Sequence, residues 1–351
     1  MVNMNQSNLI FKRFPNQHYF SFFNKKTGFF VRVGEKGVED PFWAQEGPEL
    51  LDISITNWCD QNCDICYRSS SEQGKHMSLE EYELIISQAS TLGVLQVALG
   101  GGNPNQHPQF PEILEITRVK YGIVPSYTTN GNGLSEDVIA ASEKYCGAVA
   151  VSAYHPYADT INAINKLVEK NIKTNIHFVL TSKTISTALK WLKQPPEFLY
   201  NINAIIFLNY KPAGNKAKSS LLLNNSDLVK EFFQIVGTDF PFKIGFDSCS
   251  VSGLVEYTNV DSKFIEPCEA ARFSAFISED LKMYPCSFAI EKEKGENLRD
   301  KSMVTIWRES EVFNKFRENL KTNKCSKHDC FENCLGGCPM FNEIALCNKR
   351  I

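Results

Sequence analysis

The stretch Ile-Thr-Asn-Trp-Cys-Asp-Gln-Asn-Cys-Asp-Ile-Cys-Tyr, residues 55–67, places three cysteines on one short loop directly after a strand candidate. Three thiolates on such a loop suit three irons of a [4Fe–4S] cube and leave the fourth iron open for another ligand. A structural zinc site would want four closing ligands, and His76 is the nearest further donor, so zinc stays an alternative. The loop therefore predicts a cluster with one iron free for a substrate or cofactor.

Strand and helix patterns alternate from this loop onward. The strand candidates are Leu51–Thr56, Leu95–Gly100, Ile123–Thr128, Ala148–Ala153, Ile172–Leu180 and Ile205–Tyr210, with helix candidates between them at 77–91, 110–121, 136–145, 160–170 and 184–193. This alternation predicts an α/β fold with a parallel sheet and outer helices. Six units favour an open, partial (β/α)6 barrel over a closed barrel of eight, with the chemistry at the carboxyl ends of the strands.

The flanking segments have other patterns. We expect an N-terminal β-hairpin segment at 1–50, with strands at His18–Asn24 and Thr27–Val33, the barrel core at 51–216 and a connecting segment at 217–248. Residues 249–351 predict a small cysteine-rich domain with two short strands and a helix at Thr305–Leu320. The last thirty residues lack hydrophobic periodicity, so we expect them to fold around metal.

Composition narrows the class of protein. The net charge is −3 and charged residues make up 22%, which favours neither nucleic acid nor a membrane surface as the partner. Apolar runs fall far short of the ~20 residues that cross a bilayer, and the first residues lack the pattern of a secretory signal. We therefore expect a cytoplasmic protein, in which clustered cysteines bind metal or do redox work more often than they form disulfides.

The loop at 55–67 closely resembles the cluster loop of the radical S-adenosylmethionine (SAM) superfamily. The resemblance implies that Cys59, Cys63 and Cys66 ligate a [4Fe–4S] cluster whose open iron chelates SAM. Glycines after the second strand and the Thr-Asn-Gly turn after the third also resemble the family, with Asn103 in place of its usual acid. The cofactor-binding residues implied in this way are Ile65, Gly101, Gly102, Asn103, Thr129, Asn130 and Ser152.

The C-terminal cysteines resemble the SPASM extension of radical SAM peptide-modifying enzymes, which implies two auxiliary [4Fe–4S] clusters. The first would be held by Cys268, Cys286 and Cys338, with Cys249 as the fourth ligand unless it stands free. The second would be held by Cys325, Cys330, Cys334 and Cys347. The spacing inside the C-terminal group departs from the family, and Leu281 stands where the family has a glycine. Zinc is again the alternative for this domain.

The resemblance implies reductive cleavage of SAM to a 5′-deoxyadenosyl radical that abstracts hydrogen from an unactivated C–H bond. It further implies a peptide or protein substrate, such as a short ribosomally made precursor peptide that is cross-linked or epimerised. An electron donor such as flavodoxin or ferredoxin is also implied. Formylglycine formation, as in sulfatase maturation, is an alternative, which Ser287 disfavours because those enzymes carry an aspartate at this position.

Catalytic side chains are less clear from sequence. An epimerase needs a thiol that returns hydrogen, and the candidates for catalysis are Cys249, Cys146, His177 and Tyr210. An iron–sulfur electron-transfer or binding protein without SAM cleavage is a different class, which Asn103 slightly favours. The hairpin at His18–Val33 either caps the barrel, which we favour, or pairs with a peptide strand.

Overall fold

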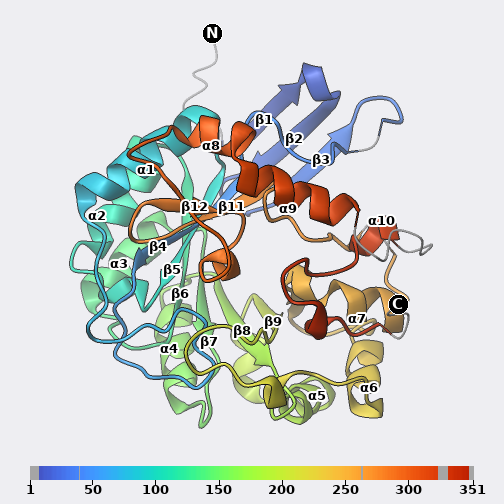
Figure 1. Ribbon diagram of the computed structural model, residues 1–351. Helices are drawn as coiled ribbons and strands as arrows, with labels where there is room; N and C mark the ends of the chain where they lie inside the picture. Colours follow the sequence, from blue (N-terminus) through green and yellow to red (C-terminus); the bar gives the residue numbers. More distant parts are fainter. Residues whose placement is uncertain (1–7, 39, 262–263, 323–330, 348–351) are drawn as a thin grey trace.

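A ten-stranded sheet organises the computed structural model, which describes residues 8–38, 40–261, 264–322 and 331–347 (Figure 1). Its strand order is β10-β9-β8-β7-β6-β5-β4-β11-β12-β13. The strands are β4 (Leu50–Thr56), β5 (Gln96–Gly101), β6 (Val124–Thr129), β7 (Ala148–Ser152), β8 (Thr174–Leu180), β9 (Ala204–Asn209), β10 (Lys243–Phe246), β11 (Ser274–Ile277), β12 (Lys282–Tyr284) and β13 (Glu296–Asn297). The six predicted strands are β4 to β9, all parallel, so the expected α/β class is confirmed.

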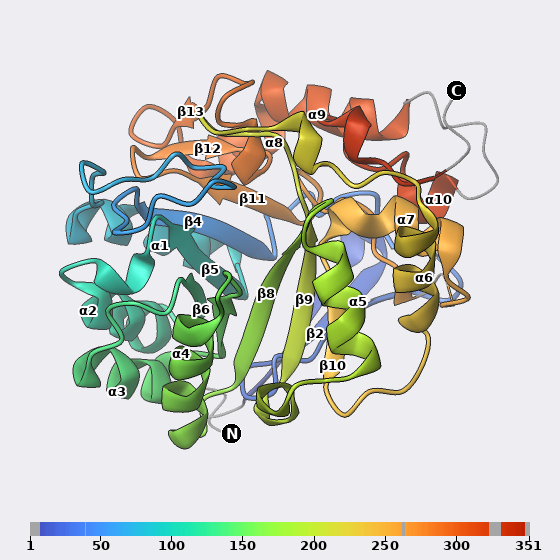
Figure 2. The same cartoon turned by 90° about the horizontal axis from the view of Figure 1, so that it is seen from below.

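Helices α1 to α5 lie on the outer side of the curved sheet (Figures 1 and 2). The helices are α1 (Leu79–Leu92), α2 (Phe110–Glu115), α3 (Glu136–Tyr145), α4 (Ala158–Glu169), α5 (Ile185–Lys193), α6 (Asp227–Ile235), α7 (Val251–Tyr257), α8 (Met303–Glu309), α9 (Glu311–Lys321) and α10 (Phe331–Cys334). Helix α1 begins with the predicted capping box between Ser78 and Glu81. The predicted helix at 110–121 ends in a π-helical turn at Ile116–Lys120.

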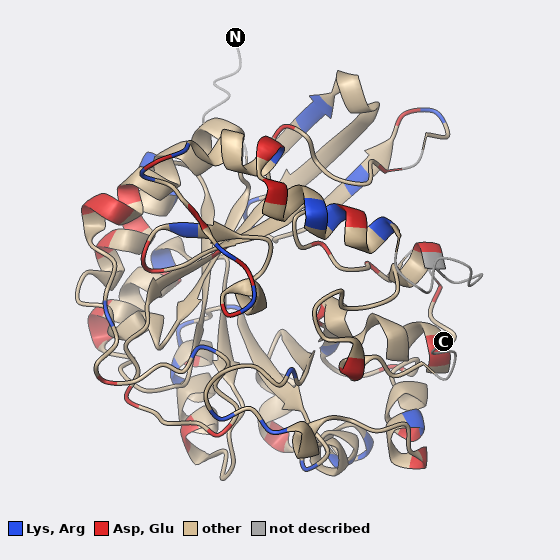
Figure 3. Ribbon diagram, in the orientation of Figure 1, with Lys and Arg blue, Asp and Glu red and all other residues tan. Residues whose placement is uncertain are grey.

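The two faces of the parallel strands have different chemistry. On β4, Leu51, Ile53 and Ile55 are fully buried in a core shared with α1, while Asp52 and Ser54 alternate with them and point to the inside of the barrel. Asp52 is the one charged residue within β4 to β9. Figure 3 shows charged residues mainly on the outer helices and loops. The interior of the barrel is thus lined by short polar side chains that can face a ligand.

The sheet extends beyond the predicted barrel on both sides. Strand β10 pairs in parallel with β9, and β11 pairs in parallel with β4, before β12 and β13 continue antiparallel. The expected boundaries at residues 50, 216 and 248 stay predictions, but the hydrogen-bonded sheet runs through the last two segments. The cysteine-rich region is therefore joined to the barrel edge by backbone pairing.

A separate three-stranded sheet forms the N-terminal segment, made of β1 (Leu9–Phe14), β2 (Tyr19–Asn24) and β3 (Phe30–Gly34). Sequence patterns missed β1. Phe23 of β2 packs on Leu95 and Val124 at the starts of β5 and β6. Arg32 of β3 contacts Glu49 at 3.0 Å and Glu269 at 2.5 Å. The small sheet thus covers the amino ends of the parallel strands, as the favoured expectation has it.

The C-terminal helical region differs from the single helix expected at Thr305–Leu320. The chain breaks at Ser310 into α8 and α9, and the Ser310 hydroxyl bonds to Glu296 at 3.1 Å. The indole of Trp307 donates to the Ala44 carbonyl at 2.7 Å and anchors α8 on the segment that precedes β4. Within the described ranges, no helix is long and apolar enough to span a bilayer. The cytoplasmic location stays a prediction.

Candidate active site

The cluster loop, residues 57–71, follows β4 and carries the first three predicted cysteines. The Cys66 amide donates to the Cys63 carbonyl at 3.3 Å, which curls the loop around its own thiols. Burial raises the pKa of Cys63 to about 11, and the neighbouring thiols of Cys66 and Cys59 raise it further. The structure thus brings the three sulfur atoms together at the carboxyl end of β4.

Two glycines let the next loop press against the cluster loop. Gly101 has φ +112°, and a Cβ there would lie 1.9 Å from the Thr56 carbonyl oxygen. A Cβ on Gly102 would lie 1.9 Å from the Trp58 carbonyl oxygen. The predicted reason for these glycines is approach to the cofactor, whereas the structure also requires them for contact with the cluster loop itself.

The Asn103 side chain is buried, and both its amide nitrogen and its oxygen are hydrogen-bonded within the protein. Its amide nitrogen donates to Gln106 at 2.7 Å and to the Asn132 carbonyl at 3.1 Å. Its oxygen accepts from the Thr129 hydroxyl at 3.1 Å and the Asn130 amide at 3.2 Å. Asn103 therefore ties the glycine loop to the Thr-Asn-Gly turn, and direct binding of a cofactor by its side chain would cost these bonds.

Asp60, which the sequence patterns did not single out, joins the same three loops. Its carboxylate accepts hydrogen bonds from Asn130 at 2.9 Å, Asn132 at 2.9 Å and Gln106 at 3.3 Å. The Asn130 amide also lies 3.8 Å from the Cys59 sulfur. A carboxylate adjacent to the first cysteine was the available signal for this network.

A cavity of about 480 Å³ opens beside the cluster loop. It is lined by Cys63, Ile65, Asn130, Tyr154 and His155, among others. The Tyr154 hydroxyl hydrogen-bonds to both Cys63 and Ser152. The cavity therefore collects Ile65 and Asn130, two of the predicted cofactor-binding residues, beside one of the cluster thiols.

The segment after β9, residues 211–218, presses on the other side of the cluster loop. Gly214 has φ +85°, and a Cβ there would lie 2.3 Å from the Cys66 carbonyl oxygen. The Asn215 amide donates to Ser69 at 2.8 Å, and Lys216 donates to the Asn62 carbonyl at 2.8 Å. The Tyr210 hydroxyl accepts from the Lys218 amide at 3.0 Å, so this catalytic candidate is used to hold the segment.

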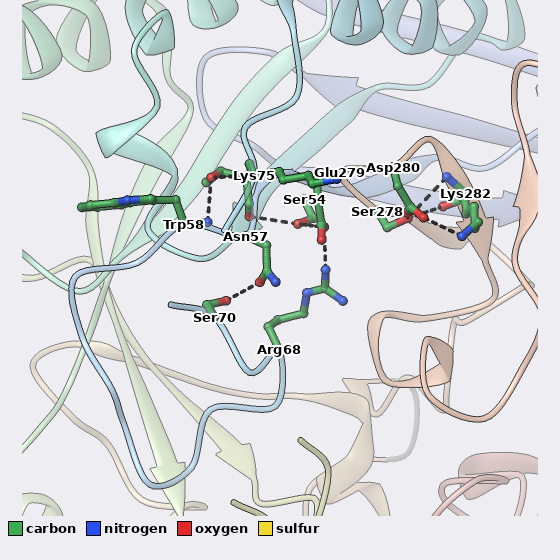
Figure 4. Close-up of polar contacts among 11 residues, drawn as sticks. Ser54, Asn57, Trp58, Arg68, Ser70, Lys75, Ser278, Glu279, Asp280 and Lys282 are labelled. Carbon is green, nitrogen blue, oxygen red and sulfur yellow. Dashed lines mark hydrogen bonds and ion pairs between the residues drawn. The ribbon is translucent and has the colours of Figure 1, made fainter. Parts of the chain in front are cut away.

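A buried ion pair connects the cluster loop to the β11–β12 hairpin (Figure 4). The Arg68 guanidinium donates to Glu279 at 2.6 Å, and the Ser54 hydroxyl donates to the same carboxylate oxygen at 2.8 Å. The Arg68 side chain is 3% exposed and lies over the Phe276 ring. Neighbouring Leu281 adopts φ +64°, which explains why the resemblance leads us to expect a glycine there.

Four thiols gather behind this hairpin. Cys249 and Cys338 are hydrogen-bonded to each other, and this contact followed by burial raises the pKa of Cys249. Burial raises the pKa of Cys286 to about 12, and nearby Cys249 raises it further. Cys268 interacts with both Cys249 and Cys286. The structure therefore brings together all four residues expected for the first auxiliary cluster.

An aromatic contact links the two groups of thiols. Tyr67, next to Cys66, stacks on Phe288 with ring centroids 4.4 Å apart, and its hydroxyl hydrogen-bonds to Ser287. Phe288 follows Cys286 by two residues. The two sites are thus held in a fixed relation through side chains adjacent to their expected ligands.

The other candidates fall into separate places. For the second auxiliary cluster, Cys334 and Cys347 are described, whereas Cys325 and Cys330 lie outside the described residues. Cys146 lies at the end of α3, just before β7, and so at the opposite end of the sheet from the cluster loop. His177 lies inside the barrel, 3.3 Å from the Thr128 hydroxyl, and burial lowers its pKa to about 4.

The donor sets suit iron–sulfur clusters. Buried thiols that raise one another's pKa need positive charge to ionise, which iron supplies. In a cube each thiolate binds a different iron, so a cluster takes thiols that are spread around it, whereas a tetrahedral zinc ion draws all of its ligands to one atom.

Comparison with known proteins agrees with this geometry. Residues 53–193 match the radical SAM superfamily, and residues 268–339 match SPASM, an iron–sulfur cluster-binding domain. Among curated proteins, the chain is similar to GTP 3′,8-cyclase of Psychromonas ingrahamii, with 26% identity covering 84% of this chain and 92% of that protein. It is also similar to the mycofactocin maturase MftC of Mycolicibacterium smegmatis, with 21% identity covering 84% and 78%.

A solved structure shares the fold over nearly the whole chain. Streptococcus suis SuiB bound to its precursor peptide SuiA aligns with a TM-score of 0.74 and 16% identity, covering 97% of this chain and 98% of that one. The fold similarity therefore includes both matched domains and the segments between them. These comparisons confirm the predicted enzyme class over the electron-carrier alternative.

Proposed function

The chain belongs to the radical SAM superfamily and carries a C-terminal SPASM domain, and from this premise we propose that it modifies a peptide or protein substrate. Its cofactors are SAM and [4Fe–4S] clusters. When bound, they supply a 5′-deoxyadenosyl radical for hydrogen abstraction from an unactivated C–H bond.

We assign the ligands from the two gathered sets of thiols. Cys59, Cys63 and Cys66 would hold the SAM-binding cluster, and the first auxiliary cluster would be held by Cys249, Cys268, Cys286 and Cys338. The gathering of those four thiols behind the hairpin is the observation that carries the proposal, because a cluster held there would put a second redox group beside the barrel interior.

The chain itself would orient the substrate through hydrogen bonds. The barrel interior carries small polar groups, and the lowered pKa of His177 keeps its imidazole neutral at physiological pH. Thr128 and Ser152 lie near it on β6 and β7. Such a lining can accept and donate hydrogen bonds to amide groups without a strong charge preference.

The similarity to proteins that act on peptides supports the substrate class. SuiB was solved with its precursor peptide bound, and MftC is a maturase. We therefore propose a short, ribosomally made precursor peptide as the substrate.

GTP is the second candidate substrate because of the similarity to GTP 3′,8-cyclase. A triphosphate needs unpaired cations. In the described part of the chain, the buried cations beside the site, Arg68 and Lys211, are each already paired with a carboxylate, Glu279 and Asp247 respectively. A triphosphate would therefore have to rely on the exposed Lys216 and Lys218. These pairings favour a peptide over a nucleotide.

Cross-linking fits the thiol positions better than epimerisation does. Cys146 lies at the wrong end of the sheet to return hydrogen to a substrate, and Cys249 is grouped with three other thiols. Sulfatase-type maturation is also disfavoured, because Ser287 is hydrogen-bonded to Tyr67 where those enzymes carry an aspartate.

We propose flavodoxin or ferredoxin as the electron donor, for which Lys216 and Lys218 offer positive charge beside the cluster loop.

The experiment is anaerobic incubation of the reconstituted enzyme with SAM, dithionite and, separately, GTP or each short peptide encoded beside the gene. We expect 5′-deoxyadenosine together with the loss of two hydrogens from one peptide by mass spectrometry. The Cys59→Ala variant is the matched control and should give neither. Conversion of GTP, or an unchanged mass for every peptide despite SAM cleavage, would contradict the proposed substrate.

A further inference from the structure

Lys211 is a buried lysine that the cluster assignments do not use. It follows β9, and its side chain is 4% exposed. The ammonium donates to the Asn209 carbonyl at 2.8 Å and to the Asp247 carboxylate, and lies 4.8 Å from the centre of the Phe288 ring. A buried ammonium is costly without a specific partner, so its position needs a reason.

The ion pair of Lys211 and Asp247 is held by hydrogen bonds to the backbone near Cys249. Asp247 lies two residues before this cysteine and accepts a hydrogen bond from Ser250 at 2.8 Å. The Asn209 side chain donates to the Cys249 carbonyl at 3.2 Å and to the Ile344 carbonyl at 3.0 Å. Lys211 is therefore held rigidly beside this thiol group.

The ammonium also lies close to the residues that carry the thiols. Asn209 links it to Cys249, because its carbonyl accepts from Lys211 and its side chain donates to the Cys249 carbonyl. Phe288, whose ring centre lies 4.8 Å from the ammonium, follows Cys286 by two residues. A methylene chain alone would fill the same space, so packing does not explain why an ammonium stands here.

We propose that Lys211 is a positioning residue that raises the reduction potential of the cluster held by Cys249, Cys268, Cys286 and Cys338, and that Asp247 partly offsets it. Reduction adds one negative charge to the cluster, and a fixed positive charge nearby stabilises the reduced state. The effect is large only where water is excluded, as it is around Lys211.

The two members of the pair should therefore act in opposite directions. In Lys211→Met we expect the reduction potential of one auxiliary cluster to fall by at least about 59 mV. For one electron this is a tenfold change in the reduction equilibrium. In Asp247→Asn it should rise. Lys211→Arg keeps the charge and should retain the wild-type value, and Lys292→Met, which removes an exposed lysine bonded to Met340, should have little effect.

The measurement is a potentiometric titration of the reconstituted holoenzyme followed by electron paramagnetic resonance. Signals that respond to added SAM belong to the cluster at the Cys59 loop and are left aside, and no substrate is needed, so the test is independent of the proposed function. Unchanged potentials in both variants, or shifts in the same direction, would overturn the proposal. If Lys211→Met retains too little iron, the Asp247→Asn and Lys211→Arg potentials decide alone.

Discussion

The guanidinium of Arg68 and the carboxylate of Glu279 form a buried ion pair at 2.6 Å, although 211 residues separate them in sequence. Arg68 stands two residues after the last cysteine of the cluster loop, and Glu279 lies in the turn between β11 and β12. The pair fixes the cluster loop against the hairpin that leads to Cys286.

Removal of Arg68 should loosen both cluster regions. In Arg68→Met the buried Glu279 loses its partner, and such a loss costs about 3–5 kcal/mol. We expect a lower thermal unfolding midpoint and less bound iron in anaerobic preparations. The matched control is Lys282→Met, which breaks the exposed pair with Asp280 in the same hairpin, where about 0–1 kcal/mol is at stake. Equal effects of the two variants would rule this role out.

Cys249 and Cys146 should differ sharply in their effect on iron content. Cys249→Ala removes one of four gathered thiols, so we expect the first auxiliary cluster to be lost or unstable. Cys146→Ala changes a partly buried thiol at the end of α3, beside Ser142, and should leave iron content unchanged. Iron and sulfide analysis measures both, and iron loss in Cys146→Ala with full retention in Cys249→Ala contradicts the assignment.

Asp52 should lower stability at neutral pH. Burial, and next the nearby Glu269, raise its pKa from 3.8 to about 6, so the folded chain holds its proton more tightly than the unfolded chain does. The stabilisation from this proton is present at low pH and is lost as the pH rises through about 6. Asp52→Asn cannot ionise, so its free energy of unfolding at pH 8 should exceed that of wild type by on the order of 1–3 kcal/mol, with a higher unfolding midpoint.

The difference should shrink as the pH falls toward 5.5, which anaerobic thermal unfolding across this range would show. Asp300→Asn, at an exposed position, is the control and should show no such trend. A difference between Asp52→Asn and wild type that stays constant with pH would speak against this explanation.

Gly214→Ala should disturb the cluster loop. A Cβ would meet the Cys66 carbonyl oxygen at 2.3 Å, and φ +85° adds the strain of a left-handed residue. Gly37 has a similar φ of +82° with nothing within 4 Å, so Gly37→Ala carries the strain without the clash. We expect 5′-deoxyadenosine formation and iron content to fall in Gly214→Ala and to stay unchanged in Gly37→Ala. Similar losses in both variants would show that backbone strain causes the loss without the clash.

The barrel and its first site were predictable because their signals are local. Alternating apolar periods located β4 to β9 to within two residues at each end, and the cysteine spacing lies on one loop. The capping box of α1 needed only Ser78 and Glu81. Each of these features depends on neighbours within a few positions along the chain.

The features that sequence missed depend on distant partners. The sequence predicts a short strand at 242–247, observed as β10, but not its parallel pairing with β9. Ser310 interrupts the single helix expected at 305–320, and its hydroxyl is hydrogen-bonded to Glu296. The partners of Lys211 and Arg68 come from other strands and loops. Asn103 stays a predicted cofactor-binding residue, and its four hydrogen bonds to two loops are a feature that the sequence patterns did not indicate.

The small sheet β1–β3 has one more consequence, for the order of events during turnover. Because it covers the starts of β5 and β6 and is tied by Arg32 to Glu49 and Glu269, ligands reach the interior from the carboxyl ends of the strands. SAM and the proposed peptide would then share an entrance, and the ligand bound deeper, against the cluster loop, would have to bind first. The position of the small sheet thus leads us to expect ordered binding, with the proposed peptide as the second ligand to bind and the first to leave.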